Sequence, residues 1–374
     1  MKNLVFSSKI FKGSRYGKGH PLDIDRVWPS IELLKIMNWV DDNQIIFNDP
    51  ASIEELTIFH DLDYLNALKK AEVLQSLDFL EKQKFNIGLG VNPIFKEVFS
   101  RPAAAAKSSM RAIEFLAKNK TQKILNFSGG THHGRKSFAS GFCFLNDCIL
   151  SILKAKELGF KKILYIDIDA HHCDAVQDNF KNENDIQIIS IHEKNKWPRT
   201  GNLEDCKISN IVNLPVPEYF NDSEIIFLID NIIIPYSIKF KPDITIIQAG
   251  TDCLKDDPQS KMILTNSSYW LSISKLKNLS IKTLILGGGG YNPYVTAKAW
   301  AGNWLVLNSN EDALQKNLNY ECKELLSSLK WNNSRVRNGV PHKWLDKWSD
   351  GFKKQHVRTE IIELVNEVKK IKNL

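Results

Sequence analysis

The sequence predicts an α/β protein built on one open parallel sheet of about eight strands, with helices on both faces. Five short apolar runs each end in a cluster of polar or glycine residues, and segments of helix length lie between them. This alternation is typical of βαβ units. The runs are continuous in hydrophobicity, as in strands that are buried on both faces. They cover residues 124–127, 163–168, 186–191, 244–247 and 284–286.

The first part of the chain is expected to be irregular and then helical. Residues 1–30 are punctuated by glycines and a proline, which favour turns. Helical periodicity appears in residues 27–40, 52–82 and 102–118. The last of these opens with Pro102, a residue that suits the first turn of a helix.

Helices are also predicted between the strands and in the tail. Residues 147–160 have helical periodicity and contain Gly159, a common helix end. From about residue 311 the chain is expected to form helices packed on the outside, ending in the amphipathic segment 358–374. We find no internal repeat and no linker, so residues 1–374 are predicted to form one domain.

Composition excludes several classes of protein. The chain has 374 residues, of which 43% are hydrophobic, but no apolar run is long enough to span a membrane. No cleavable signal is recognised at the N-terminus, and the six cysteines follow no paired spacing, so a cytoplasmic protein with reduced thiols is expected. The net charge of +7 is scattered, which argues against a dedicated nucleic-acid surface. Nothing in the sequence specifies an oligomeric state.

Acidic and histidine residues follow the strand predicted at 163–168. Asp169 and His171 are two positions apart, so their side chains project to one side of an extended segment and suit a metal ion. Asp167 lies on the same side one pleat deeper, where it can hold a partner in place. Asp252, after another strand, is the best third ligand, although a lone aspartate at a strand end is often a helix cap. Imidazole and carboxylate ligands favour zinc.

Three more side chains at strand ends are candidates for catalysis. His132 and His133 follow the strand at 124–127, and either can move protons near neutral pH when a carboxylate such as Asp167 or Asp174 fixes its tautomer. Tyr291 follows four glycines, which allow close approach of a ligand, and its hydroxyl can donate to an oxyanion. The alternatives are surface histidines and a packed tyrosine beside a flexible turn.

Four ordered motifs carry a family resemblance. The motifs SGGTHHGRKSFASGFCFLND, YIDIDAHHCDAVQDNF, QAGTD and LGGGGYN together resemble the zinc-dependent histone deacetylase family. This family includes bacterial deacetylases of the acetoin-utilisation type and acetylpolyamine amidohydrolases. The resemblance runs from about Gly17 to about Trp300 and implies the arginase/deacetylase fold.

The resemblance also implies roles for individual residues. Zinc is expected on Asp169, His171 and Asp252. His133 is expected to act as general base and then acid, with Asp174 behind it. His132, backed by Asp167, is expected to be its electrostatic partner, and Tyr291 to bind the carbonyl oxygen. The remaining implied residues are Gly141, Phe142, Trp197 and Gln259 along a substrate tunnel, Asp167, Asp169, His171, Ser190 and Ile191 around a structural potassium ion, and Arg26 at an inner cavity.

The chain departs from the family pattern at several positions. Cys173 stands where most relatives have glycine, and Thr131 precedes the tandem histidines. Relatives often grip the acetyl-lysine backbone with a rim aspartate, but no acidic residue lies between Phe85 and Phe95. Polyamine-specific members tend to have a glutamate where this chain has Gln259.

The function expected from the resemblance is zinc-dependent hydrolysis of the amide of an acylated amine, with release of acetate. Acetyl-lysine in proteins or peptides is the first substrate class, and an acetylpolyamine or another small amide is the alternative. A protein that binds acylated ligands without turnover is a further alternative. Binuclear manganese ureohydrolases share the fold but need more carboxylates than these motifs supply.

Overall fold

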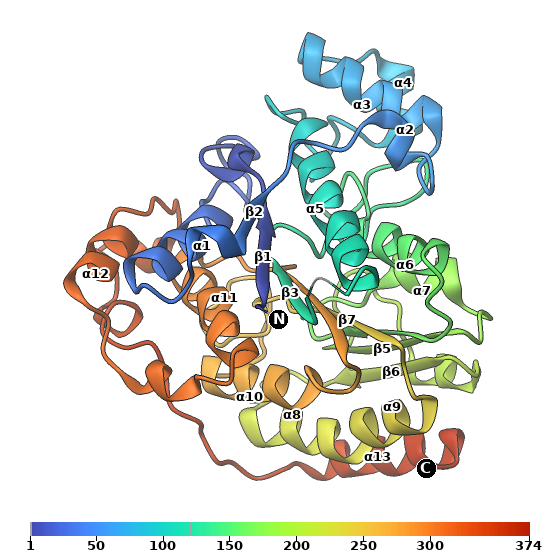
Figure 1. The fold of residues 1–374 in the computed structure, drawn as a ribbon, viewed down its shortest axis with the longest axis vertical. Coiled ribbons are helices and arrows are strands. Elements are labelled where there is room, and N and C mark those ends of the chain that lie inside the picture. The colour runs from blue at the N-terminus through green and yellow to red at the C-terminus, as the bar shows by residue number, and fades with distance from the viewer. Residues whose placement is uncertain (1, 120) are drawn as a thin grey trace.

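A computed structural model describes residues 2–119 and 121–374. Its centre is a single sheet of eight parallel strands in the order β2-β1-β3-β8-β7-β4-β5-β6 (Figure 1). The strands are β1 (Leu4–Ser7), β2 (Ile45–Phe47), β3 (Lys123–Asn126), β4 (Ile163–Asp167), β5 (Ile186–Glu193), β6 (Ile211–Val216), β7 (Ile244–Gln248) and β8 (Lys282–Leu286). The open parallel sheet of about eight strands predicted from the sequence is confirmed.

Helices cover both faces of the sheet, as predicted (Figure 1). One face is covered by α1 (Val27–Ile36), α8 (Asp222–Leu228), α9 (Ile234–Phe240), α10 (Asn266–Leu276), α11 (Pro293–Leu307), α12 (Tyr320–Ser327) and α13 (Thr359–Lys372). The other is covered by α5 (Ser100–Ala117), α6 (Asp147–Glu157) and α7 (Asp174–Phe180). Beyond α5 lie α2 (Ile53–Leu56), α3 (Leu62–Leu74) and α4 (Phe79–Phe85).

The protein has a hydrophobic core on each face of the sheet, and alternate residues of β4 pack into the two cores. Leu164 and Ile166 belong to the core under α1, α10 and α11, whereas Ile163 and Tyr165 belong to the core under α5 and α6. All five residues of β4 are buried. Because both faces of the strand are covered, its sequence is an apolar run without alternation.

Asparagine caps join two helices to the loops that carry the candidate site. Asn146 caps α6 by accepting a hydrogen bond from Ile149 N, and its Nδ2 donates to the carbonyls of His132 and Gly134. Asn292, which directly follows Tyr291 of the glycine loop, caps α11, and the helix starts with Pro293. A side-chain acceptor satisfies helix amides that have no partner within the helix. These caps therefore fix the loop ends as well as the helices.

Three strands lie in segments where no strand was predicted. Residues 4–7 were expected to be irregular, but they form β1, which pairs with β2 on one side and β3 on the other. Neither β2, with three residues, nor β6, which contains Pro215 at the sheet edge, has a distinctive apolar run. The helical region predicted at 52–82 divides into α2, α3 and α4.

The tail carries α12 and α13, with α13 lying along α8 and α9 (Figure 1). Short 3-10 segments occur at Lys9–Phe11, Asp42–Gln44, Leu203–Lys207, Glu311–Gln315, Ser334–Val336 and His342–Trp344, and a π-helical segment, Ile229–Ile233, joins α8 to α9. Among the residues described, none of the helices combines the length and the apolar character needed to cross a membrane.

Candidate active site

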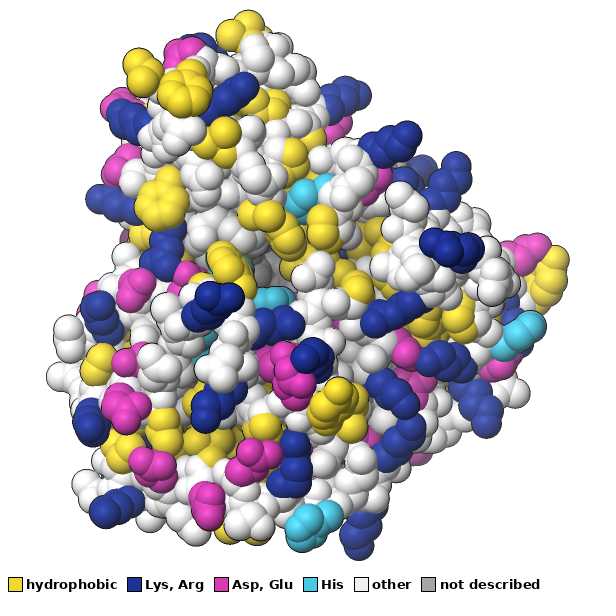
Figure 2. Space-filling model, turned by 180° about the vertical axis from the view of Figure 1, so that it is seen from behind, with side chains coloured by type: hydrophobic (Ala, Val, Ile, Leu, Met, Phe, Trp, Pro, Cys, Tyr) yellow, Lys and Arg dark blue, Asp and Glu magenta, His cyan; other side chains and the backbone are white. Residues whose placement is uncertain are grey.

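The candidate residues meet at the carboxyl edge of four adjacent strands. His132 and His133 follow β3, Asp169 and His171 follow β4, and the other two candidates, Asp252 and Tyr291, follow β7 and β8. These strands are neighbours in the order β3-β8-β7-β4. Seen from behind, the molecule has a hollow near its centre that hydrophobic side chains border, and histidine side chains are visible there (Figure 2). The parallel sheet thus gathers residues that are up to about 160 positions apart.

Asp169, His171 and Asp252 form a cluster that can hold a metal ion. Each offers one ligand atom, and these atoms all lie within 4.8 Å of one another. Nδ1 of His171 lies 3.1 Å from Oδ1 of Asp169 and 3.0 Å from Oδ2 of Asp252. One imidazole nitrogen and two carboxylate oxygens therefore converge, which is the donor number and chemistry of a catalytic zinc site.

Charge and packing around this cluster also fit a cation. Burial lowers the pKa of His171, but Asp169 and Asp252 outweigh burial and raise the pKa to about 10, so positive charge is favoured here. A Cβ on Gly289 would lie 2.0 Å from Oδ2 of Asp252, and one on Gly250 would lie 2.1 Å from Oδ2 of Asp169. Glycine at both positions lets the backbone enclose the two carboxylates.

The second carboxylate oxygen of each aspartate is held by hydrogen bonds. Asp169 Oδ2 accepts from Gln248 Nε2 at 2.8 Å and from the backbone N–H of Gly289 at 2.7 Å. Asp252 Oδ1 accepts from the backbone N–H of Ala170 at 2.9 Å. Such contacts orient ligands and tune the site. Gln248, the last residue of β7, opens the recognised motif QAGTD, but the sequence analysis gave it no role, because a glutamine side chain has many possible local partners.

The tandem histidines lie beside the cluster, each with its own carboxylate. His132 Nδ1 is 2.7 Å from Asp167 Oδ2, and His133 Nδ1 is 2.7 Å from Asp174 Oδ1. Arg135 also pairs with Asp174. The rings of His132 and His133 lie 4.0 Å apart, and the ring of His133 is 6.1 Å from that of His171. The pairing of His132 with Asp167 and of His133 with Asp174 is the arrangement that the family resemblance implied.

The environment separates the pKa values of the two histidines. Burial lowers the pKa of His132, but the charges of Asp167 and Asp169 outweigh it and raise the pKa to about 9. Burial and the neighbouring charge of His132 lower the pKa of His133 to about 3. Asp174 has its pKa lowered to about 2, because the contacts with His133 and Arg135 outweigh burial. An ionised Asp174 accepts the Nδ1 proton of a neutral His133, whose Nε2 is then a base.

Asp147 holds the loop that presents these histidines. It is fully buried and accepts hydrogen bonds from the backbone N–H groups of Gly130 and Thr131, from Oγ1 of Thr131, and from Oγ of Ser109. Its motif was recognised in the sequence, but its role depends on the packing of α5, which carries Ser109, against α6, which begins with Asp147, and no local pattern reveals that packing.

Tyr291 faces the cluster from the glycine loop. The side chain is buried, and its hydroxyl makes no hydrogen bond to any residue that the structure describes. Burial and the charges of Asp252 and Asp169 hold the pKa of Tyr291 well above its usual value, so the hydroxyl stays protonated. Asp257, which sequence reasoning missed, accepts the backbone N–H of Tyr291 at 2.6 Å and that of Gln259 at 2.8 Å.

Aromatic residues border the approach to the histidines. The indole of Trp197 lies 4.5 Å from the ring of His133, and a Cβ on Gly141 would lie 2.2 Å from that indole. Phe142 stands 5.9 Å from Tyr291, ring to ring. Its backbone has φ +67°, which is rare outside glycine. The conformation is held because Phe142 N donates to Oδ1 of Asn92, while Tyr16 donates to its carbonyl.

Four further residues singled out in the sequence lie on or beside the strands and loops that carry the cluster. Arg26 donates to the carbonyls of Gly288 and Gly290 and lies over the Trp300 ring, while its role at an inner cavity stays a prediction. Ser190 pairs with Asp167 in the β4–β5 register, and Ile191 follows it. Cys173 is fully buried, and burial holds the pKa of its thiol well above the usual value, as expected for an inert packed cysteine.

Known proteins match most of the chain. A family model described as "Histone deacetylase domain" matches residues 20–307. The histone deacetylase 8 of Xenopus tropicalis is 31% identical over 72% of this chain and 74% of its own length. The chain belongs to the histone deacetylase family. Human histone deacetylase 1 is 30% identical over 76% of this chain, which corresponds to 60% of the human protein.

Solved structures of this family extend the likeness to the tail. The crystal structure of a histone deacetylase homologue from Aquifex aeolicus superposes with a TM-score of 0.92 at 33% identity, over 99% of this chain and 100% of that one. A homologue complexed with the ligand SAHA matches with the same TM-score, identity and coverage. The family and fold inferred from the four motifs are confirmed.

Proposed function

We propose that this histone deacetylase family member is a zinc-dependent amide hydrolase that removes acetyl groups from acetyl-lysine in proteins or peptides. A histidine held as a neutral base, an unpartnered tyrosine hydroxyl and a cation-binding cluster converge at one sheet edge. This juxtaposition carries the proposal, because amide hydrolysis needs a base, a group that stabilises the oxyanion and an electrophile.

Each side chain has a defined task. His133 takes a proton from the attacking water at Nε2 and returns it to the leaving amine, while Asp174 holds Nδ1–H. His132 lies against His133 and, with Asp167, sets the local charge. Tyr291 donates its hydroxyl proton to the developing oxyanion, since nothing described in the chain competes for it. Phe142 and Trp197 exclude water and align the substrate's methylene chain.

Asp169, His171 and Asp252 would hold the zinc ion. When bound, zinc supplies Lewis-acid chemistry, which polarises a carbonyl group and increases the acidity of water. A structural potassium ion beside Asp167, Asp169, His171, Ser190 and Ile191 remains part of the proposal, supported by the register that sets Ser190 beside Asp167.

All six cysteines are free, which supports a reducing compartment such as the cytoplasm.

The test is release of acetate from an acetyl-lysine peptide by the zinc-loaded protein, compared with Tyr291→Phe. The variant is expected to keep its zinc and its melting temperature but to lose roughly 10²- to 10³-fold in kcat, the usual loss when one oxyanion donor is removed. A fully zinc-loaded wild-type protein that releases no acetate would refute the proposal. Near-normal turnover by Tyr291→Phe would refute the role of the tyrosine.

A further inference from the structure

We infer that a pocket beside Tyr291, formed in part by the C-terminal tail, binds a second, positively charged group of the substrate. The inference rests on the proposed function and narrows its substrate class. The group that the pocket would bind is an ammonium group, and it belongs to the same molecule as the acylated amine.

The pocket is a cavity of about 190 Å³ between three segments distant in sequence. Asp23 comes from the N-terminal loop, Gln259 from the loop after β7, and Trp331 with Asn332 from the tail after α12. Tyr291 lines the pocket as well. A substrate that places its acyl group at Tyr291 therefore has this cavity next to it.

Asp23 brings a negative charge that the protein does not neutralise. Its carboxylate makes no hydrogen bond or ion pair with any residue in the described part of the chain, whereas its backbone N–H donates to the His20 carbonyl. Two basic groups, Arg15 and His20, lie close enough for the charge of Asp23 to raise their pKa values. Both are engaged elsewhere, so the carboxylate stays available to a ligand.

The contacts of these two basic groups show why they do not neutralise Asp23. Arg15 forms a two-point pair with Asp25, through Nε at 3.2 Å and through its second terminal nitrogen. His20 accepts the backbone N–H of Leu22 at Nδ1 and faces the carbonyl of Val91 with Nε2, which suits the neutral imidazole. Burial also lowers the pKa of His20. His20 is thus uncharged near neutral pH.

Trp331 gives the pocket a second feature that favours a cation. Its indole packs 6.3 Å from the ring of Tyr294 and 5.9 Å from that of Trp344. No described lysine or arginine lies over the Trp331 ring. A tryptophan face attracts ammonium groups, and the amide oxygens of Gln259 and Asn332 can accept their hydrogen bonds. A carboxylate or phosphate would be repelled by Asp23.

The ligand chemistry is therefore that of a free amine on the same molecule as the scissile amide. An acetylated diamine or polyamine carries one, and so does a peptide with a basic side chain next to its acetyl-lysine. Trp331 and Asn332 lie beyond residue 307, where the match to the family model ends. The tail thus supplies the wall of the pocket that contributes, through Trp331 and Asn332, to the preference for a positively charged substrate group.

The experiment compares matched substrates on the zinc-loaded full-length enzyme. N-acetylputrescine is paired with N-acetylbutylamine, and a peptide with lysine beside its acetyl-lysine is paired with one that has norleucine there. The measured quantity is the ratio of kcat/KM between the charged and neutral members of each pair, for the wild type, Asp23→Asn and Asp23→Lys. Asp42→Asn is the matched control, since the Asp42 side chain is 93% exposed. Asp42 lies just before β2, at the amino end of a strand, whereas the candidate site lies at the carboxyl ends of the strands.

The wild type is expected to favour the charged member of one pair by roughly tenfold at low ionic strength, the combined effect of a carboxylate and an indole, mainly through KM. The ratio should fall to about one in Asp23→Asn and below one in Asp23→Lys, because the attraction is lost and then reversed, and should stay high in Asp42→Asn. The pair that shows the preference identifies whether the charge comes from a polyamine or from a peptide.

The outcomes separate this inference from the proposed function. Turnover of neutral and charged substrates with equal kcat/KM in the wild type would overturn the ammonium subsite and leave the hydrolase proposal standing. A preference that survives in Asp23→Asn would also overturn it. If the zinc-loaded protein hydrolyses none of the four substrates, the proposed function fails, and the inference fails with it.

Discussion

His133 and His132 are adjacent in the chain, yet their surroundings give them opposite acid–base properties. Two carboxylates close to His132 raise its pKa to about 9, whereas burial and the charge on His132 lower the pKa of His133 to about 3. Groups whose environments push their pKa values apart can divide the tasks of base and electrostatic support. The order of the two residues along the chain does not reveal which task each has.

The metal cluster leads to the first prediction. His171→Ala or Asp252→Ala should abolish both zinc binding and activity, because each removes one of three protein ligands. Zinc per chain is measured by atomic emission on folded protein. His172→Ala is a control, since the two ring nitrogens of His172 pair with Thr200 and Gln177. This variant should still bind zinc. Full zinc occupancy in either ligand variant would disprove the assignment.

His60 should make stability depend on pH. Its Nδ1 faces the carbonyl of Lys136, and its Nε2 accepts the backbone N–H of Asn146, the cap of α6. Both ring nitrogens of the neutral imidazole are thus hydrogen-bonded. Burial lowers its pKa from 6.5 to about 4. Because the unfolded chain binds this proton more tightly, the stabilisation is complete above pH 6.5 and is lost as the pH falls toward 4.

The loss expected from His60 is about 3 kcal/mol in the free energy of unfolding between pH 7 and pH 4, from the size of the shift. Urea unfolding of the wild type and of His60→Gln measures it, since glutamine can accept the Asn146 N–H but does not titrate. The wild type should lose more stability than the variant over this range. Parallel pH profiles would show that His60 is not the titrating group.

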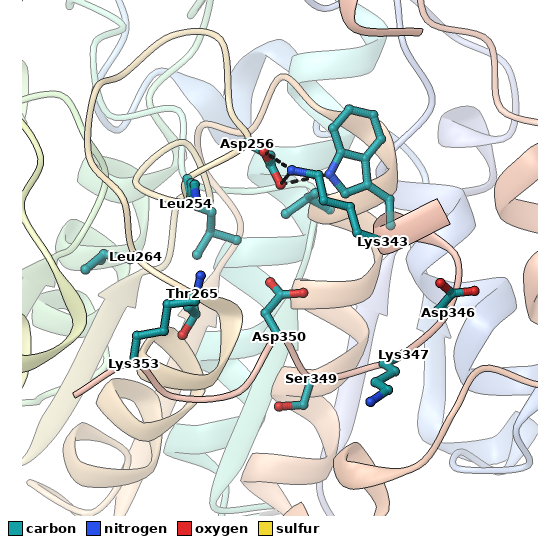
Figure 3. A pocket seen from close by; sticks show the side chains of 13 residues that line it. Leu254, Asp256, Leu264, Thr265, Lys343, Asp346, Lys347, Ser349, Asp350 and Lys353 are labelled. Carbon is teal, nitrogen blue, oxygen red and sulfur yellow. Dashed lines mark hydrogen bonds and ion pairs between the residues drawn. The ribbon is translucent and has the colours of Figure 1, made fainter. Parts of the chain in front are cut away.

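The loop after β7 connects the metal cluster, Tyr291 and the tail. Asp252 is a candidate ligand, and Asp257 holds the backbone of Tyr291. Between them, Asp256 accepts from Lys343 at 2.7 and 2.8 Å and from Trp344 Nε1 at 2.9 Å, on the wall of a second cavity of about 320 Å³ (Figure 3). The tail therefore anchors the same loop that positions the candidate catalytic groups.

We predict separate effects for the two neighbouring aspartates. Asp257→Asn leaves one acceptor oxygen for two backbone N–H groups, so Tyr291 loses support and kcat should fall roughly tenfold, the effect of about one hydrogen bond, with zinc retained. Asp256→Asn, the matched control, should lower the melting temperature with kcat changed by less than about twofold, because the Asp256 carboxylate is hydrogen-bonded to Lys343 and Trp344 of the tail and the substitution leaves its backbone contacts in place. Steady-state kinetics with zinc analysis measures both effects. Equal losses of kcat in the two variants would contradict the assignment.

In the molecule as a whole, the tail closes the face of the sheet that α8 and α9 cover. The helix α13 buries Ile361, Leu364, Val365 and Val368 against that core. Just before it, Arg358 reaches Glu224 through Nε at 2.6 Å and through its second terminal nitrogen at 2.7 Å. Glu224 is fully buried at the start of α8.

Removal of this pair should destabilise the fold without impairing catalysis. Arg358→Ala leaves the carboxylate of Glu224 buried without its cation, which costs roughly 3 kcal/mol in the free energy of unfolding. Arg337→Ala, at an exposed arginine of the same tail, should change it by less than about 0.5 kcal/mol. Chemical denaturation measures both values, and a loss below about 1 kcal/mol in Arg358→Ala would contradict the prediction.

Sequence patterns were sufficient to predict the central strands and to locate most residues of the candidate site. Parallel strands with both faces covered become continuous apolar runs, and residues 163–167 show this directly. The polar residues that end such runs, including Asp169 and Tyr291, meet because all carboxyl ends of a parallel sheet share one edge. This inference needs only local hydrophobicity and the direction of the strands.

Other features depended on contacts between segments far apart in the chain. The strand β1 is formed by pairing with β2 and β3, not by a pattern of its own. Asp257 acquires its role because Tyr291, 34 positions away, donates to it, and the pocket beside Tyr291 exists because Trp331 packs there. Single polar residues have many possible local roles, so their partners become known only when long-range packing brings them together.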